Sequence, residues 1–199
     1  MNISITRKRI ILVEGKDDKG IIESICKEAQ LDDAIQVIPY IEEGKLTQFL
    51  RLLVRDANFE RVHHIGLTKD SDRGAERARQ SLENAWDHAR KELKALDIPE
   101  PKCSVFAIPN NRSTGRVEDL CLQSAAFPRV LRCARLMYWC ARMVSIYRMD
   151  RQKSLVAAYL SLMQKSRVPL GASAGKGYWN LRSDAFGPLR EFVISIGTQ

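Results

Sequence analysis

Short apolar runs and amphipathic stretches alternate along the first 110 residues of the chain. Four apolar stretches predict strands, at residues 9–13, 35–38, 61–68 and 103–108. The first of them is an unbroken apolar run, which is typical of a strand buried on both faces. Segments with helical spacing of apolar side chains, or with a helix-favouring composition, lie between them at residues 17–29, 46–53 and 75–96. Strand and helix therefore follow one another throughout this part of the chain.

This alternation predicts an α/β fold of the Rossmann-like type, with roughly four parallel strands flanked by helices and joined by right-handed crossovers. After Gly115 the pattern becomes mostly helical, and helices are expected at residues 118–124, 128–146, 151–164 and 185–195. We expect an α/β core over residues 1–120 and a mostly helical, basic extension over residues 121–199. The extension should pack on the core, so that the two form a single globular unit.

Length and composition are those of a globular protein with one core, or with one core and a small appendage: 199 residues, 45% apolar and 28% charged. No run of about eighteen apolar residues occurs, and the run at 10–13 is too short for a signal-peptide core, so neither a membrane span nor a signal peptide is expected. The five cysteines are scattered through apolar stretches without metal-binding spacing. They predict buried thiols in a reducing compartment, and a cytoplasmic location.

Charge is distributed unevenly along the chain, whose net charge is +8. Residues 1–100 carry 17 basic and 19 acidic side chains, a net of −2, whereas residues 101–199 carry 15 basic and 5 acidic side chains, a net of +10. An acidic half is thus followed by a strongly basic one. This asymmetry suggests a polyanionic partner for the second half, with solubility alone as the alternative.

Acidic side chains lie just past three of the four predicted strands. Glu14 and Asp18 follow the first strand, Asp70 and Asp72 follow the third, and Glu118 lies beyond the fourth. Neighbouring strand ends of a parallel sheet lie about 5 Å apart, so carboxylates from two of them can share one cation. Because magnesium keeps several waters, two or three carboxylates suffice. The sequence predicts a Mg²⁺ or Mn²⁺ site at Glu14, Asp70 and Asp72, with Asp18 and Glu118 available for a second ion.

Helix capping is the alternative role for some of these acids. Asp17, Asp18, Glu118 and Asp119 lie in the first turns of predicted helices, where the macrodipole stabilises negative charge. Glu14 differs, because it directly ends a buried apolar strand, where an unpaired charge is costly. Asp70 and Asp72 would repel each other unless a positive group lay between them.

Two motifs at these strand ends, Val13-Glu14-Gly15-Lys16-Asp17-Asp18 and Leu67-Thr68-Lys69-Asp70-Ser71-Asp72, resemble the Toprim signature. Topoisomerases, bacterial primases, recombination-repair proteins, ribosomal RNA maturases and the overcoming-lysogenization-defect (OLD) nucleases share that signature. This resemblance covers residues 9–120. A second set of residues resembles an uncharacterised bacterial Toprim-like family of similar length over nearly the whole chain: Asn110-Asn111, Gly115, Glu118-Asp119-Leu120, Gly177-Tyr178-Trp179 and Phe186.

The resemblance implies a Toprim-type fold with a general acid or base at Glu14 and metal ligation by Asp70 and Asp72. Resemblance to the OLD nucleases adds a second acid at Asp18 and one after the fourth strand at Glu118. Those nucleases also use a lysine in the C-terminal region, for which Lys153 and Lys176 are both candidates. The chain lacks their ATPase domain, and it lacks the tyrosine-bearing domain of a topoisomerase, so strand passage is not expected.

The predicted helix at 128–146 carries a basic face. Between Pro128 and Lys153 there are seven basic residues against one acidic residue. A helical wheel places four arginines and one aromatic ring on one side: Arg129, Arg132, Arg135, Arg142 and Trp139. The opposite, apolar side is expected to contain Val130, Cys133, Ala134, Met137, Cys140 and Ala141. Such a face could bind phosphates and stack on a base, or it could belong to an ordinary amphipathic surface helix.

The leading hypothesis is a divalent-metal-dependent phosphodiester hydrolase that acts on DNA or RNA. The segment 171–177 resembles a phosphate-binding loop but has Gly177 where Ser or Thr is required, so an ATPase is not predicted. One alternative is a Toprim-fold protein that binds nucleic acid or a partner without efficient catalysis. A nucleotide phosphohydrolase or transferase is another. A protein partner or a homodimer remains open, and no membrane partner is expected.

Overall fold

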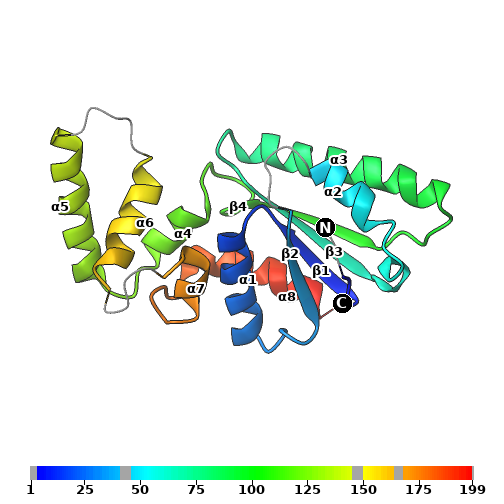
Figure 1. Ribbon diagram of the computed structural model, residues 1–199, viewed down its shortest axis with the longest axis horizontal. Coiled ribbons are helices and arrows are strands. Elements are labelled where there is room, and N and C mark those ends of the chain that lie inside the picture. The colour runs from blue at the N-terminus through cyan, green and yellow to red at the C-terminus, as the bar shows by residue number, and fades with distance from the viewer. Residues whose placement is uncertain (1–3, 41–45, 145–149, 164–167, 199) are drawn as a thin grey trace.

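A computed structural model of the chain describes residues 4–40, 46–144, 150–163 and 168–198. Its centre is a parallel sheet of four strands in the order β2-β1-β3-β4 (Figure 1). The strands are β1 (Arg9–Val13), β2 (Ile35–Pro39), β3 (His64–Asp70) and β4 (Lys102–Ile108). The predicted α/β, Rossmann-like fold is confirmed.

Helices cover both faces of this sheet (Figure 1). One face packs against α1 (Lys16–Glu28) and α8 (Gly187–Gly197), and the other against α2 (Leu46–Leu53) and α3 (Ala75–Ala95). The alternation of β1 explains the two layers, because Ile11 belongs to the core on the α1 side and Ile10 to the core on the α2 side. Both side chains are fully buried, as expected for an unbroken apolar strand.

The remaining helices extend from one end of the sheet (Figure 1). They are α4 (Val117–Gln123), α5 (Pro128–Val144), α6 (Arg151–Ser161) and α7 (Leu170–Ala174). Helix α6 packs between α4 and α5, and α7 packs on α1. The last helix, α8, returns to the sheet through buried Leu189, Val193 and Ile196. The C-terminal segment therefore completes the core.

Element boundaries differ from the predicted ones at several places. Strand β3 begins at His64, because Phe59–Arg61 forms a 3-10 turn before it. Helix α7 was not predicted, since four of its five residues are small and the segment shows no apolar period. The predicted helix 151–164 ends at Ser161, and position 164 lies outside the described residues, as do positions 145–146 of the predicted helix 128–146. In the part of the chain that the structure describes, no helix has the length and apolar character needed to cross a membrane.

The thiols are only partly buried. Cys26 and Cys121 are buried and Cys103 is half-buried, but Cys133 and Cys140 are exposed. The prediction of buried thiols was wrong for these last two, because α5 packs on α6 through another side.

Helices α1 and α7 touch through glycine backbones. A Cβ on Gly20 would lie 2.5 Å from the carbonyl carbon of Gly171, and a Cβ on Gly171 would lie 2.9 Å from the carbonyl oxygen of Asp17. The backbone N–H of Gly171 also donates a hydrogen bond to Oδ1 of Asp17 at 3.0 Å. Helix α7 therefore holds the first turn of α1 in place, directly after the end of β1.

We expect Gly20→Ala to lower the free energy of unfolding, because α1 and α7 would have to separate. Overpacking of this kind typically costs about 1–3 kcal/mol, whereas alanine gains at most about 1 kcal/mol over glycine in a helix interior. Gly175→Ala is the matched control, since a Cβ there comes no closer than 3.9 Å to another atom and the backbone already has a negative, helical φ. It should leave stability unchanged or raise it slightly. Urea unfolding followed by circular dichroism measures both variants, and equal stabilities would contradict the close packing.

Candidate active site

The carboxyl ends of β1 and β3 bring Glu14 and Asp70 together. The two strands are neighbours, with Leu12 opposite Leu67, so the residues that end them lie side by side. Oε2 of Glu14 accepts a hydrogen bond from the backbone N–H of Asp70 at 3.1 Å. The loop after β4 joins the same edge, because the N–H of Ser71 donates to the carbonyl oxygens of Ile108 and Gly115.

These strand ends form one wall of a cleft of about 380 Å³, here called the acidic cleft. Its other walls are the first turns of α1, α4 and α6. Six carboxylates and three cationic side chains line it: Glu14, Asp17, Asp18, Asp70, Asp72 and Glu118, with Lys16, Arg116 and Lys153. All five predicted metal-binding residues therefore meet at one edge of the sheet, although long stretches of sequence separate them.

Asp18 has a structural role in addition to its place in the cleft. It is buried, and its Oδ2 accepts a hydrogen bond from the backbone N–H of Gly15 at 2.9 Å, which caps α1. Burial raises the pKa of Asp18 to about 7, the Gly15 hydrogen bond opposes the rise, and the nearby charge of Glu14 adds to it. The capping role considered for Asp18 is thus present in the structure, and its carboxyl also faces the other acids.

Asp70 is the most perturbed of these acids. Burial raises its pKa to about 9, and the charges of Asp18 and Glu14 contribute to the rise. Its Oδ1 is buried and accepts no hydrogen bond from the described residues. An orphaned carboxylate oxygen surrounded by other carboxylates is stabilised by a proton or by a cation. The residues present therefore fit a hard cation.

The number of ligands limits what the acidic cleft can hold by itself. Among residues 4–40, 46–144, 150–163 and 168–198, no three His, Cys, Asp or Glu side chains form a group that could hold a metal ion. Magnesium is commonly bound by one or two carboxylates together with waters and substrate phosphates. Asp70 with Glu14 or Asp18 could supply such a pair.

Arg116 was not predicted as a site residue. It forms ion pairs with Asp72 and with Asp150, the second at 2.6 Å. Asp150 in turn caps α6 by accepting a hydrogen bond from the N–H of Lys153 at 3.0 Å. Arg116 is therefore the positive group beside the Asp70 and Asp72 pair. Its place in the sequence, between Gly115 and the acid pair that begins α4, was the only signal that could have indicated it.

The two candidate lysines lie in different places. Lys153 lines the acidic cleft, close enough for its charge to act on Glu118, whose pKa burial nevertheless raises. Lys176 lies exposed in the turn after α7 and is not part of the cleft lining. Asp119 caps α4 by accepting a hydrogen bond from the N–H of Arg116 at 2.9 Å.

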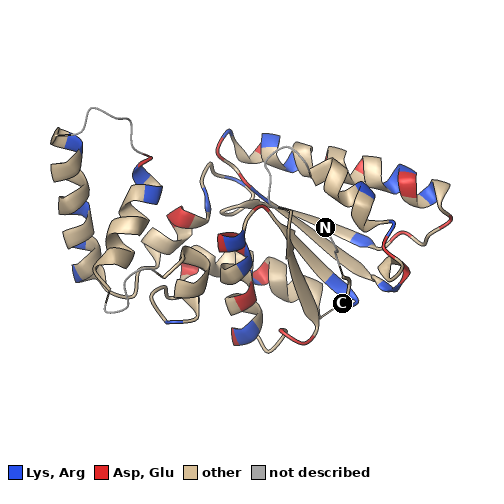
Figure 2. Cartoon of the chain, viewed as in Figure 1, with Lys and Arg blue, Asp and Glu red and all other residues tan. Residues whose placement is uncertain are grey.

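The basic residues of α5 lie apart from the acidic cleft, on the helix farthest from the sheet (Figures 1 and 2). Arg129, Arg132, Arg135 and Arg142 are exposed. Trp139 is 56% exposed, and the guanidinium carbon of Arg142 lies 6.0 Å from its ring centroid. The predicted arginine face is therefore open to solvent.

The apolar side predicted for α5 was partly wrong. The side chains that pack inward are Leu131, Ala134 and Tyr138, with Val130 and Ala141 half-buried beside them. Cys133, Met137 and Cys140 are exposed. The buried side of α5 differs from the predicted side because α5 packs mainly on α6, and Tyr138 is buried in that contact.

Comparison with known proteins identifies a family. The family described as "Protein of unknown function (DUF3226)" matches residues 8–196, nearly the whole chain. No curated protein and no solved structure matches.

The raised pKa values predict that the metal-free protein loses stability as pH rises. Carboxyl groups in an unfolded chain have a pKa of about 3.9, whereas the fold raises the pKa of Asp70 to about 9 and that of Asp18 to about 7. Between these limits the folded state binds more protons than the unfolded state, so the free energy of unfolding falls with rising pH. We expect the Tm in EDTA to fall from about pH 5 to about pH 9, and Mg²⁺ or Mn²⁺ to oppose the fall.

Asp70→Asn should make the Tm fall less steeply with rising pH, because the amide does not titrate. At about pH 8 it should raise the Tm by at least about 2 °C, which corresponds to about 1 kcal/mol in a domain of this size. Glu60→Gln, at an exposed position of the 3-10 turn, is the control and should follow the parent. Differential scanning fluorimetry measures all three proteins. An Asp70→Asn variant whose Tm falls as steeply as the parent's would show that this carboxyl does not carry the effect.

Proposed function

The chain belongs to the DUF3226 family, and we propose that it is a divalent-metal-dependent phosphodiester hydrolase that acts on DNA or RNA. The single observation that carries the proposal is the acidic cleft, where carboxylates from the ends of β1 and β3 and from the first turns of α1 and α4 line one hollow together with the orphaned Oδ1 of Asp70. Acids gathered at the carboxyl edge of a parallel sheet stand where such sheets bind their ligands. A cation would stabilise a cluster of this charge at neutral pH.

In this proposal Asp70, with Glu14 or Asp18, holds Mg²⁺ or Mn²⁺. When bound, the ion would neutralise charge on a phosphate oxygen and lower the pKa of a water molecule. Glu14 or Asp18 accepts the proton of the attacking water, since both lie beside Asp70 and Asp18 has a pKa of about 7. Lys153 contributes a positive charge from the opposite wall of the cleft.

Arg116 has a positioning role in this scheme. Its guanidinium joins Asp72, after β3, to Asp150, at the start of α6. Helix α6 also carries Lys153. The two ion pairs of Arg116 therefore fix the position of this lysine relative to the acids of the cleft. Arg116 neutralises the charge of Asp72 in the structure. Asp72 could bind a metal ion only if this ion pair were broken.

The sequence resemblance supports the same proposal. Glu14-Gly15 directly follows β1, and Asp70-Ser71-Asp72 lies at the end of β3, the neighbouring strand. These are the strand ends at which the Toprim signature has its Glu-Gly and Asp-x-Asp motifs. We propose on this ground that the chain is Toprim-like.

We expect the parent protein to cut at least one polynucleotide with Mn²⁺ or Mg²⁺. Supercoiled plasmid, single-stranded DNA and structured RNA should each be tested. Glu14→Gln should lose about 10²–10⁴-fold in rate, the usual contribution of a general base. Asp70→Asn should lose at least as much, because it also removes a metal ligand. Gel assays of the three substrates measure the rates.

Glu60→Gln serves as the matched control and should cut like the parent. Calorimetry with Mn²⁺ separates metal binding from catalysis, and Asp70→Asn should show the larger loss of affinity of the two site variants. A parent that cuts none of the three substrates would contradict the proposal, and so would an Asp70→Asn variant with full activity.

A second candidate function is binding without efficient catalysis, and α5 is the observation that favours it. Beside its arginines this helix exposes large apolar side chains: Leu136 is 66%, Met143 85% and Val144 83% exposed. Exposed apolar side chains gathered on one helix are typical of surfaces that bind a partner. In this case nucleic acid or a protein would bind at α5.

Replacing Arg132, Arg135 and Arg142 together by Ala tests the part that α5 plays. For a nuclease that binds its substrate through α5, polynucleotide binding and cleavage should both fall, and the salt dependence of binding should weaken. An enzyme that acts on free nucleotides would keep its turnover in this variant. Replacing Arg61, Lys91 and Lys94 by Ala removes the same charge from other exposed positions and is the control. Equal losses in the two triple variants would rule out a specific role for α5.

A further inference from the structure

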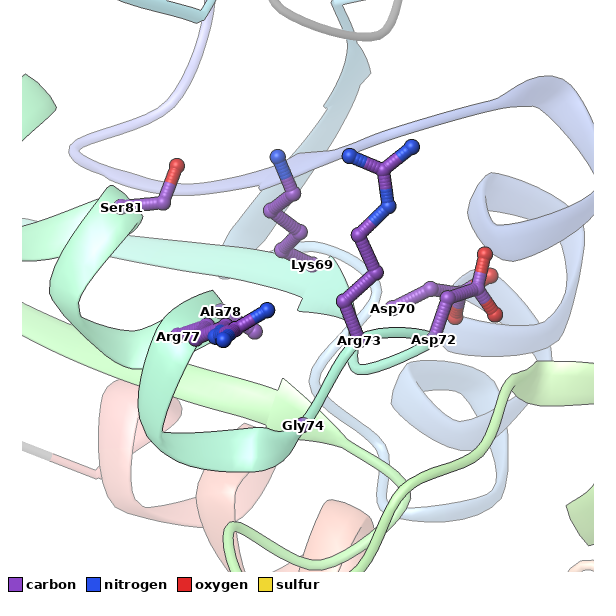
Figure 3. A pocket seen from close by; sticks show the side chains of 8 residues that line it. All are labelled: Lys69, Asp70, Asp72, Arg73, Gly74, Arg77, Ala78 and Ser81. Carbon is purple, nitrogen blue, oxygen red and sulfur yellow. The ribbon is translucent and has the colours of Figure 1, made fainter.

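A second hollow adjoins the acidic cleft on the other side of β3. It has a volume of about 490 Å³ and lies at the first turns of α3 (Figure 3). We call it the α3 groove. Its lining combines three cationic side chains, the two acids that it shares with the acidic cleft, and small residues: Lys69, Arg73 and Arg77, Asp70 and Asp72, and Gly74, Ala78 and Ser81.

The alternation of β3 places Lys69 and Asp70 on opposite faces of the sheet, although Asp70 stands at the edge and lines both hollows. Leu67 packs in the core under α2 and α3, and Lys69, two residues on, lies on the same face. Asp70, the next residue, faces α1 and its acids. Arg73 lies in the turn that follows, and Arg77 in the first turn of α3, one helical turn further on. In Figure 3 the side chains of Lys69 and Arg73 extend side by side in the same direction.

These three cations have no carboxylate partners among the described residues. The ion pairs of α3 instead use other arginines of the same helix: Arg79 with Glu76 and Glu83, and Arg90 with Asp87. Three cations face two acids in this lining, and one of the acids, Asp72, is already paired with Arg116. The α3 groove therefore keeps an excess of positive charge, which raises the local concentration of anions. The number and position of the three cations indicate an anionic ligand.

The position of the α3 groove limits which anionic ligands can bind there. It shares Asp70 and Asp72 with the acidic cleft, so one extended molecule can occupy both hollows across the carboxyl edge of the sheet. The N-terminus of α3, a helix of 21 residues, opens onto this groove and adds a partial positive charge. A polynucleotide strand has the required form, since it carries one phosphate after another along an extended backbone.

We infer that the α3 groove binds the backbone phosphates of a polynucleotide strand next to the phosphate that lies in the acidic cleft. The inference rests on the proposed function and adds a direction to it: the strand crosses the edge of the sheet over β3 toward α3. Arg73 and Arg77 bind successive phosphates, and Lys69, which lines the same groove, adds its positive charge. Because these contacts reach only the backbone, binding here does not depend on base sequence.

The test compares two double variants of α3 with equal loss of charge. Arg73→Ala with Arg77→Ala removes two cations of the groove. Lys91→Ala with Lys94→Ala removes two exposed lysines from the far end of the same helix, about 21 Å away from Arg77 at 1.5 Å per residue. Binding of a fluorescein-labelled 12-nucleotide single strand, as DNA and as RNA of the same sequence, is measured by fluorescence anisotropy in EDTA, so that no cleavage occurs.

We expect the groove variant to bind at least about tenfold more weakly than the parent. The slope of log affinity against log salt should fall by about 0.7 for each phosphate that the variant no longer binds, or about 1.4 for two phosphates. The control variant should stay within about twofold of the parent. A decrease confined to the DNA or the RNA strand identifies the strand that the groove accepts. Equal weakening in both variants, or full binding by the groove variant, would overturn the inference.

Cleavage with Mn²⁺ separates the failure of the groove from the failure of the proposed function. If the parent cuts nothing and the groove variant has lost binding, the proposed hydrolysis is refuted, but the inference that the α3 groove binds phosphates is retained. A parent that cuts, with a groove variant that binds and cuts equally well, would refute the groove and keep hydrolysis. Circular dichroism of both variants should match the parent, because all four replaced side chains are exposed.

Discussion

The crowding of carboxylates at the carboxyl edge of the sheet is the constraint on which the rest of this structure depends. Glu14 and Asp70 end neighbouring strands and meet there, joined by the hydrogen bond from the N–H of Asp70 to Glu14. Helix α1 adds the buried carboxyl of Asp18. Water is partly excluded and the charges repel, so Asp70 and Asp18 have pKa values well above the usual range. The fold tolerates this destabilisation at the edge of the sheet where we propose that a cation binds.

Cationic side chains surround these acids without neutralising all of them. Arg116 pairs with Asp72 and Asp150 and so ties α6 to the end of β3. Lys153 stands on the far wall, and Lys69 with the arginines of the α3 groove lies across the strand. Acids thus occupy the centre of the edge and cations its flanks. That arrangement suits a phosphate chain whose central phosphate is held through a metal and whose neighbours are held by protein cations.

The two basic surfaces of the chain differ in kind. The α3 groove is a hollow next to the acids, built from residues in the acidic half of the sequence. The face of α5 is a helix surface at the end of the molecule, where basic residues lie along the helix (Figure 2). The same helix exposes the apolar side chains of Leu136, Met143 and Val144. The first suits contacts close to the reacting phosphate. The second suits a longer ligand or a protein partner, and the net charge of +10 in the second half of the sequence comes partly from it.

The sequence by itself determined the sheet and the acids of the cleft, because both depend on local signals. An unbroken apolar run such as residues 9–13 is typical of a strand that is buried on both faces of a parallel sheet. The carboxyl ends of the strands in such a sheet lie at the same edge. Tertiary packing decided the rest. It turned the buried side of α5 toward Leu131 and Tyr138, brought α8 back to the sheet, and separated Lys153 from Lys176. It also placed Arg116 against Asp72 and Lys69 beside Arg73, since such partners depend on contacts between residues that no sequence period connects.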